Sequence, residues 1–256
     1  MPKTDNNNQD IYDAAAYLSE DYREALEEYY SNSVGSNVWK LQNFSKYVPR
    51  QALTRFIIRH EIFKMVLNVQ GSVAELGVLD GGSLLSWAHL SSIFEPLNYQ
   101  RKVIGFDMFG EHPTTSEKDK TGKSSHIYDN KRFTLDAYQD IKNSVCVLDK
   151  NRPMGEIEKV ILVKGDASKS VPEYIEKHPE TLISLLYLDI NLYEPTRVAL
   201  EQFIPRMPKG AIIVFDELND RGFPGETIAV IETIGIRNLR IQRFPYDTKI
   251  SYAILD

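Results

Sequence analysis

The chain alternates short apolar runs with stretches whose apolar positions recur at helical spacing. Runs of four to six apolar residues are typical of buried strands, and they lie at 73–76, 103–106, 160–163, 183–188 and 211–215. Strands that alternate with helices predict an α/β fold with a parallel sheet covered on both faces. Ligands of such sheets bind beyond the carboxyl ends of the strands, so the residues after each strand are the candidates for function.

Two further segments precede the first strand. Apolar residues recur at helical spacing over 11–30 and 49–69, which predicts two helices. The apolar surface of the second is broader than one stripe, as expected for core packing or a contact between subunits. Its basic residues could meet an anionic substrate, but a solvated face is the favoured interpretation: Arg50, Arg55, Arg59 and His60.

The end of the chain predicts a different kind of strand pairing. Residues 237–243 and 250–255 have strand character, and 244–247 between them has the composition of a turn. An antiparallel pair is therefore expected after the parallel strands. We expect an N-terminal helical extension over 1–70 and one α/β domain over 71–256.

Composition favours a small-molecule partner. The chain has 256 residues, 42% hydrophobic and 26% charged, enough for one sizeable core. Its net charge of -6 and the lack of a basic patch argue against nucleic acid. No apolar run is long enough to span a membrane, so a cytoplasmic protein is expected. One cysteine, Cys146, excludes an intramolecular disulfide and is predicted to be buried on a helix.

The first strand leads into a glycine turn and a helix. Gly77 and the pair Gly81–Gly82 allow the backbone to approach a ligand, as in many nucleotide-binding proteins. Glu75 before the turn and Ser83 at the start of the helix are candidate cofactor ligands. The ordinary alternative is a tight strand-to-helix turn that binds nothing.

Acidic residues follow the second and third strands. Asp107 can accept hydrogen bonds from ribose hydroxyls, although this does not distinguish S-adenosylmethionine (SAM) from NAD. Asp166 lies in the segment 164–168, where it could either face a nucleoside or cap the next helix. Together with the glycine turn, these residues favour a nucleoside ligand.

Carboxylates also follow the fourth and fifth strands. If these strands are neighbours, Asp189, Asp216 and Glu217 come together, and such a set suits a hard cation such as Mg²⁺ or Ca²⁺. Each residue alone could be a helix cap or a solvated acid. Three acids at adjacent strand ends would repel one another without a cation or a proton.

Four segments together resemble one family. Residues 75–78, 105–109, 188–196 and 223–227 look like the macrocin-type (TylF-like) O-methyltransferases, with the resemblance extending from about residue 49 to 227. It implies a Rossmann-like class I methyltransferase domain with SAM as cofactor. It also implies Mg²⁺-assisted transfer of a methyl group to a hydroxyl, commonly on a deoxysugar of a natural product. By the same resemblance, segment 164–168 would reach the adenine ring.

Position by position, the family's metal ligands fall on Asp189, Asp216 and Glu217. Where the family often has an acid that is a candidate general base, this chain has Asn191, which cannot take a proton. Asn191 would then orient the substrate, and His89 or His112 could accept the proton.

Two alternatives stay open. An NAD(P)-dependent oxidoreductase would share the glycine turn and Asp107 but would leave the strand-end carboxylates unexplained. A non-catalytic nucleoside-binding module is compatible with Asn191. The polar segment 111–132 is expected to form a lid beside the ligand. The partners expected are a small hydroxyl acceptor, glycosylated in the family, and further copies of the chain in a homo-oligomer.

Overall fold

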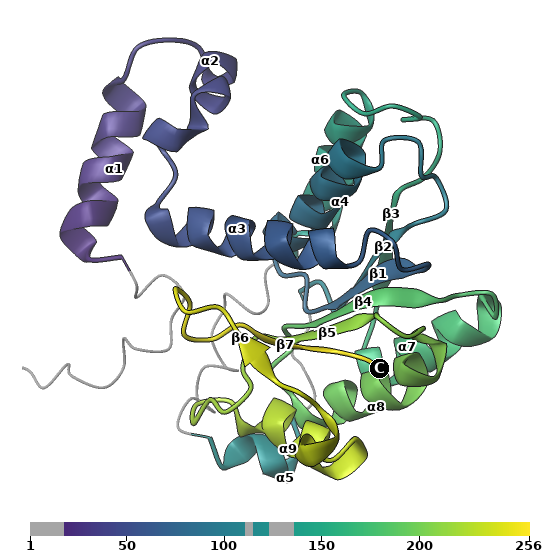
Figure 1. Cartoon of the computed structure of the whole chain (residues 1–256). Coiled ribbons are helices and arrows are strands. Elements are labelled where there is room, and N and C mark those ends of the chain that lie inside the picture. Colours follow the sequence, from purple (N-terminus) through teal and green to yellow (C-terminus); the bar gives the residue numbers. More distant parts are fainter. Residues whose placement is uncertain (1–17, 111–114, 123–135) are drawn as a thin grey trace, which may run out of the picture. The chain divides into compact units, whose positions relative to one another are not determined.

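The computed structural model describes residues 18–110, 115–122 and 136–256 (Figure 1). The chain divides into two compact units, residues 1–55 and 56–256. The division lies inside helix α3 (Arg50–Met65), earlier than the boundary at residue 70 suggested by the sequence. The reason is that Ile58, Ile62 and Phe63 are fully buried in the core of the second unit.

The first unit contains short helices with little buried surface. Its elements are α1 (Glu20–Asn32), α2 (Asn37–Gln42), a 3-10 turn η2 (Phe44–Lys46) and the start of α3. The side chain of Ser19 accepts the N–H of Tyr22 at 3.3 Å, which caps α1 and explains why this helix begins later than the pattern over 11–30 suggests. Residues 11–17 of that pattern lie outside the described residues.

The second unit is built on one seven-stranded sheet. In spatial order β3-β2-β1-β4-β5-β7-β6, the first five strands are parallel, as predicted, and β7 is antiparallel to both neighbours. Strand order reverses between β1 and β4, which is where sheets of this kind bind ligands. The strands are β1 (Ser72–Leu76), β2 (Val103–Asp107), β3 (Val160–Lys164), β4 (Ile183–Leu188), β5 (Ile212–Phe215), β6 (Gln242–Arg243) and β7 (Ser251–Ile254).

Helices cover both faces of this sheet (Figure 1). One face packs on the second part of α3, on α4 (Gly82–Phe94) and on α6 (Tyr138–Asp149). The other face packs on α7 (Ala167–Lys177), α8 (Tyr193–Phe203) and α9 (Pro224–Thr233). The remaining described helical segments are α5 (Glu117–Lys120) and the 3-10 turns η5 (Ile204–Arg206) and η6 (Ile236–Asn238).

Two details differ from the sequence-based expectations. The strand predicted over 237–243 is reduced to the two residues of β6, because Gly235, with φ of 80°, introduces the turn η6 in its place. Cys146 is exposed on α6 and not buried. None of the helices in the described part of the chain is long and apolar enough to cross a membrane.

A buried arginine fixes the end of α3 on the sheet. The Arg101 guanidinium donates to the carbonyls of Val66 at 3.1 Å, Val69 at 3.0 Å and Gly71 at 2.7 Å. It also forms an ion pair with Glu95 at 2.6 Å. Three backbone acceptors and a carboxylate satisfy the buried charge, so the C-terminal part of α3 is held firmly beside β1.

Candidate active site

The glycine turn after β1 packs directly on the end of β4. Gly77 has φ of 86°, and a Cβ atom there would lie 1.9 Å from the backbone oxygen of Asp189. Gly81, with φ of 84°, forms the N-cap of α4. The predicted turn is thus present, and it brings the backbone at the candidate cofactor site against the first of the candidate metal ligands.

Glu75 is fully buried under this turn. Its Oε2 atom accepts hydrogen bonds from Ser83 Oγ at 2.9 Å and Trp87 Nε1 at 2.8 Å. Its Oε1 atom is buried without a hydrogen-bond partner in the described structure. Burial raises the pKa of Glu75 to about 8, and the nearby positive charge of Arg59 opposes this shift. The structure therefore brings together the predicted cofactor residues Glu75 and Ser83.

The raised pKa predicts a pH-dependent stability. Folding raises the pKa of Glu75 from 4.5 to about 8, so the folded chain keeps a proton that the unfolded chain releases between these values. Stability is then lost as the pH rises through this range, by at most about 1.4 kcal/mol per pH unit. Glu75→Gln keeps an acceptor for Ser83 and Trp87 and removes the titration. Urea unfolding of the cofactor-free variant should depend less on pH than that of the wild type, and equal slopes would contradict this assignment.

Asp107 ends β2 and shapes the same turn. Its Oδ2 atom accepts the backbone N–H groups of Val78 at 2.8 Å and Leu79 at 3.1 Å, and its Oδ1 atom accepts that of Phe109 at 2.7 Å. Three backbone donors hold the carboxylate at the carboxyl edge of the sheet, where a ribose ligand is predicted. Contact with ribose stays a prediction.

Asp166 lies beside a hollow at the same edge. Its side chain caps α7, accepting the N–H of Ser168 at 2.9 Å and its hydroxyl at 2.7 Å, so the capping role considered from the sequence is present. Asp166 and Ser168 also line a hollow of about 360 Å³. Its other lining residues come from the region of α5 and from the start of α8: Thr115, Ser116, Glu117, Lys118, Tyr193, Glu194 and Pro195.

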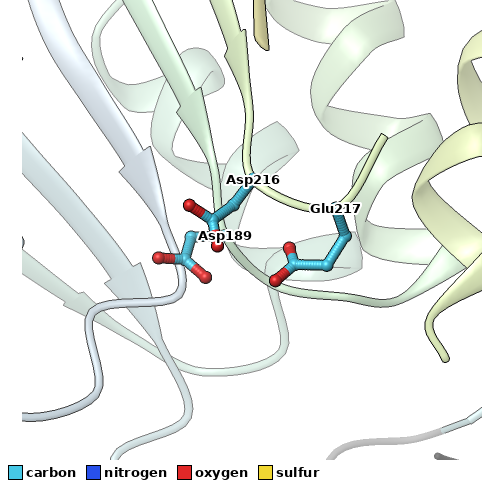
Figure 2. A group of neighbouring side chains, drawn as sticks. All are labelled: Asp189, Asp216 and Glu217. Carbon is cyan, nitrogen blue, oxygen red and sulfur yellow. The ribbon is translucent and has the colours of Figure 1, made fainter. Parts of the chain in front are cut away.

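Three carboxylates meet at the ends of β4 and β5. Figure 2 shows Asp189, Asp216 and Glu217 with their carboxylates turned toward one another. One oxygen from each lies within 4.8 Å of the others. Burial raises the pKa of Glu217 well above its usual range, and the charges of Asp216 and Asp189 raise it further. The predicted cluster is formed, and its mutual repulsion is of the kind that a bound cation relieves.

Two buried polar side chains hold the residues of this cluster in place. The hydroxyl of Tyr187 donates to Asp216 Oδ1 at 2.9 Å. Oε1 of Glu226, on α9, accepts the backbone N–H of Glu217 at 3.1 Å. Sequence reasoning did not select either residue, although Glu226 lies in the segment 223–227 that carries the family resemblance. Its pKa is raised by burial and then by the charge of Asp216.

Asn191 belongs to the same cluster. Its backbone has φ of 62°, a left-handed conformation that asparagine tolerates better than most residues. With its amide nitrogen facing Glu217, it donates to the two carboxylate oxygens at 3.0 and 2.6 Å. Asn191 thus fixes a candidate metal ligand, and its contact with the substrate stays a prediction.

The two candidate histidines are placed differently. His89 is exposed on α4, and partial burial of its ring lowers its pKa. It is not a member of the carboxylate cluster. His112 lies outside the described residues, as does most of the predicted lid over 111–132, so neither prediction is tested.

The sheet order, with five parallel strands and an antiparallel pair at one end, is that of the class I methyltransferases among solved structures. The sequence matches the macrocin-O-methyltransferase (TylF) family over residues 59–224, well over half of the chain. The chain belongs to this family and is a SAM-dependent O-methyltransferase. A search of curated proteins gave no significant match.

Solved structures agree with this assignment. CalS11, a calicheamicin methyltransferase, is 29% identical over 92% of this chain and 93% of its own, with a TM-score of 0.86. The apo structure of CalS11, a TDP-rhamnose 3'-O-methyltransferase, is 28% identical over 92% of this chain and 95% of its own, with a TM-score of 0.78. The O-methyltransferase NovP, 17% identical over 78% and 79% of the two chains with a TM-score of 0.63, shares the fold.

Proposed function

We propose that this enzyme methylates a hydroxyl on a sugar of a natural product, with help from Mg²⁺. The observation that carries the proposal is the meeting of Asp189, Asp216 and Glu217 beside the glycine turn. A metal site next to a cofactor site suits methyl transfer to an oxygen that must be made nucleophilic. The similarity to CalS11, a TDP-rhamnose 3'-O-methyltransferase, supports a sugar as the acceptor.

The residues at the switch point fit a bound SAM molecule. A side chain at Gly77 would collide with β4, so the turn offers bare backbone at the carboxyl edge of the sheet. Buried Glu75 has an oxygen without a partner among the described residues. We assign cofactor binding to Glu75, Gly77, Ser83 and Asp107, together with Asp166 beside the hollow. SAM supplies an activated methyl group, and the chain must hold it in line with the acceptor oxygen.

The carboxylate cluster fits a divalent cation. Asp189, Asp216 and Glu217 offer only oxygen ligands, which Mg²⁺ prefers, and a bound cation would oppose the rise in the pKa of Glu217 that burial and the other two charges cause. Bound Mg²⁺ would lower the pKa of an acceptor hydroxyl. Tyr187 and Asn191 would keep the ligand oxygens oriented, because Tyr187 donates to one oxygen of Asp216 and Asn191 to both oxygens of Glu217.

The chain departs from the family in its means of removing the acceptor proton. Asn191 has no basic group and its amide faces Glu217. We keep His89 and His112 as candidate bases, with His89 favoured to be neutral at pH 7 because its pKa is lowered.

Methyl transfer to chosen acceptors tests the proposal. SAM with an isotope-labelled methyl group would be incubated with TDP-rhamnose and with glycosylated natural products, in the presence of Mg²⁺. We expect the label on a sugar hydroxyl of at least one acceptor, located by NMR. Binding of SAM in calorimetry with transfer to none of these acceptors would contradict the proposed sugar acceptor.

We also propose that the chain forms a homo-oligomer through its first unit. Large apolar side chains of this unit are solvent-exposed to 52–80%, namely Val34, Val38, Trp39, Leu41 and Phe44. Contiguous exposed apolar residues on a small unit commonly mark an interface. Light scattering should give a mass above that of one chain, and Trp39→Asp with Leu41→Asp should lower it.

A further inference from the structure

Arg59 lies at the point where strand order reverses. It belongs to the part of α3 that packs on the sheet, and its guanidinium carbon is 5.8 Å from the centroid of the Tyr187 ring. Tyr187 on β4 is the register partner of Glu75 on β1, and these two strands flank the switch point. Arg59 therefore sits over the place where an α/β sheet binds its ligand.

The basic group of Arg59 is incompletely satisfied. Its Nε atom is buried and has no hydrogen-bond partner in the part of the chain that the structure describes. The side chain as a whole is partly exposed, so the sequence-based expectation of a solvated face fails only for this buried atom. Leaving a buried charged donor unpaired is costly, and such groups usually mark a missing partner. The Nε atom of Arg59 therefore needs a hydrogen-bond acceptor, and an anion is the strongest acceptor for a guanidinium group.

Glu75 does not fill this requirement. Its Oε1 atom is also buried without a partner, although the positive charge of Arg59 is close enough to lower its pKa. The other oxygen, Oε2, is held by Ser83 and Trp87. Two neighbouring polar atoms, Arg59 Nε and Glu75 Oε1, thus both lack a hydrogen-bond partner among the described residues. A ligand that carries both an anion and a cation would satisfy both.

The amino-acid end of SAM has this chemistry. Its carboxylate is the only anionic group of the cofactor, and its ammonium group lies on the same carbon. We infer that Arg59 binds the carboxylate of the methionine moiety of SAM. The inference rests on the proposed cofactor site and adds a residue from α3, a helix that lies before the glycine turn in the chain. Arg101 holds the end of this helix on the sheet, so the guanidinium is positioned in advance.

The alternative is that Arg59 only offsets the charge of Glu75. A pair of ligands separates the two roles: S-adenosylhomocysteine (SAH) and its decarboxylated analogue, which keeps the ammonium group and lacks the carboxylate. Arg59→Met preserves most of the side-chain length and removes the charge. Lys64→Met is the matched control, since Lys64 is exposed on the same helix.

Calorimetry with both ligands tests the inference. Arg59→Met should weaken SAH binding about 10- to 100-fold, the range for a lost hydrogen bond to a charged group, and leave the affinity for the decarboxylated analogue unchanged. Arg59→Lys should recover part of the loss, and Lys64→Met should bind both ligands as the wild type does. Equal weakening of both ligands, or unchanged SAH affinity, would overturn the role of Arg59. Failure of the wild type to bind SAH would instead overturn the cofactor site itself.

Discussion

Asp216→Asn should reduce turnover at least about 100-fold and leave the affinity for SAH within a few-fold of the wild type. Asp216 is one of three carboxylates within 4.8 Å of one another, and loss of one charge should weaken cation binding more than the 10- to 100-fold typical of residues outside the ligand shell. The cofactor does not depend on this charge in the proposed site. Calorimetric titration with Mn²⁺, with no acceptor present, should show that Asp216→Asn binds the cation more weakly than the wild type does.

The matched control is Asp220→Asn. Asp220 follows the same strand but lies outside the carboxylate cluster, where it pairs with Lys249 at 3.4 Å. This variant should keep its Mn²⁺ affinity and most of its turnover. EDTA should abolish wild-type activity and Mg²⁺ should restore it. Full activity in EDTA, or equal effects of the two substitutions, would remove the metal from the proposal.

Gly77→Ala should destabilise the fold by at least about 2 kcal/mol and abolish measurable SAH binding. Alanine would adopt φ of 86° at a cost, and its Cβ atom would lie 1.9 Å from the Asp189 backbone oxygen. The end of β4 would have to move, and with it the first candidate metal ligand. Urea unfolding and calorimetry measure the two effects separately.

Gly82→Ala provides the comparison within the same turn. A Cβ atom at Gly82 would meet its nearest neighbour, Asp80 Oδ1, at 3.6 Å, an ordinary contact. Gly82 is also the first residue of α4, where alanine is favourable. We expect the free energy of unfolding of this variant to lie within about 0.5 kcal/mol of the wild-type value or slightly above it. Similar damage from both substitutions would mean that the contact with β4 is not what requires glycine.

Local patterns were enough to predict the sheet and the cluster of acids. Apolar runs such as 183–188 are buried on both faces, so their composition alone predicts parallel strands. Asp189 and Asp216 follow strands that pair directly, and the parallel arrangement brings both to one edge. The glycine turn could also be predicted from the sequence, because the conformation that Gly77 adopts there is one that other residues avoid.

The supporting side chains could not be predicted in this way. Tyr187 on β4 donates to Asp216 at the end of the neighbouring strand β5, and Glu226 on α9 accepts from Glu217. Neither contact follows from spacing in the sequence. As a basic residue on a helix, Arg59 was expected on a solvated face. Its Nε atom is buried because α3 packs on the sheet, which the sequence alone does not indicate. The prediction of a strand over 237–243 was wrong for most of its length, because Gly235 introduces a turn where the side-chain composition favours a strand.

A crystal structure grown with SAH and Mn²⁺, with the metal located by anomalous scattering, tests the central claim most directly. Mn²⁺ takes the same oxygen ligands as Mg²⁺. The proposed site predicts one peak within coordination distance of Asp189, Asp216 and Glu217, with SAH on the glycine turn and its carboxylate at Arg59. Ordered SAH without a metal peak between the carboxylates, or SAH bound away from the β1–β4 switch point, would contradict it.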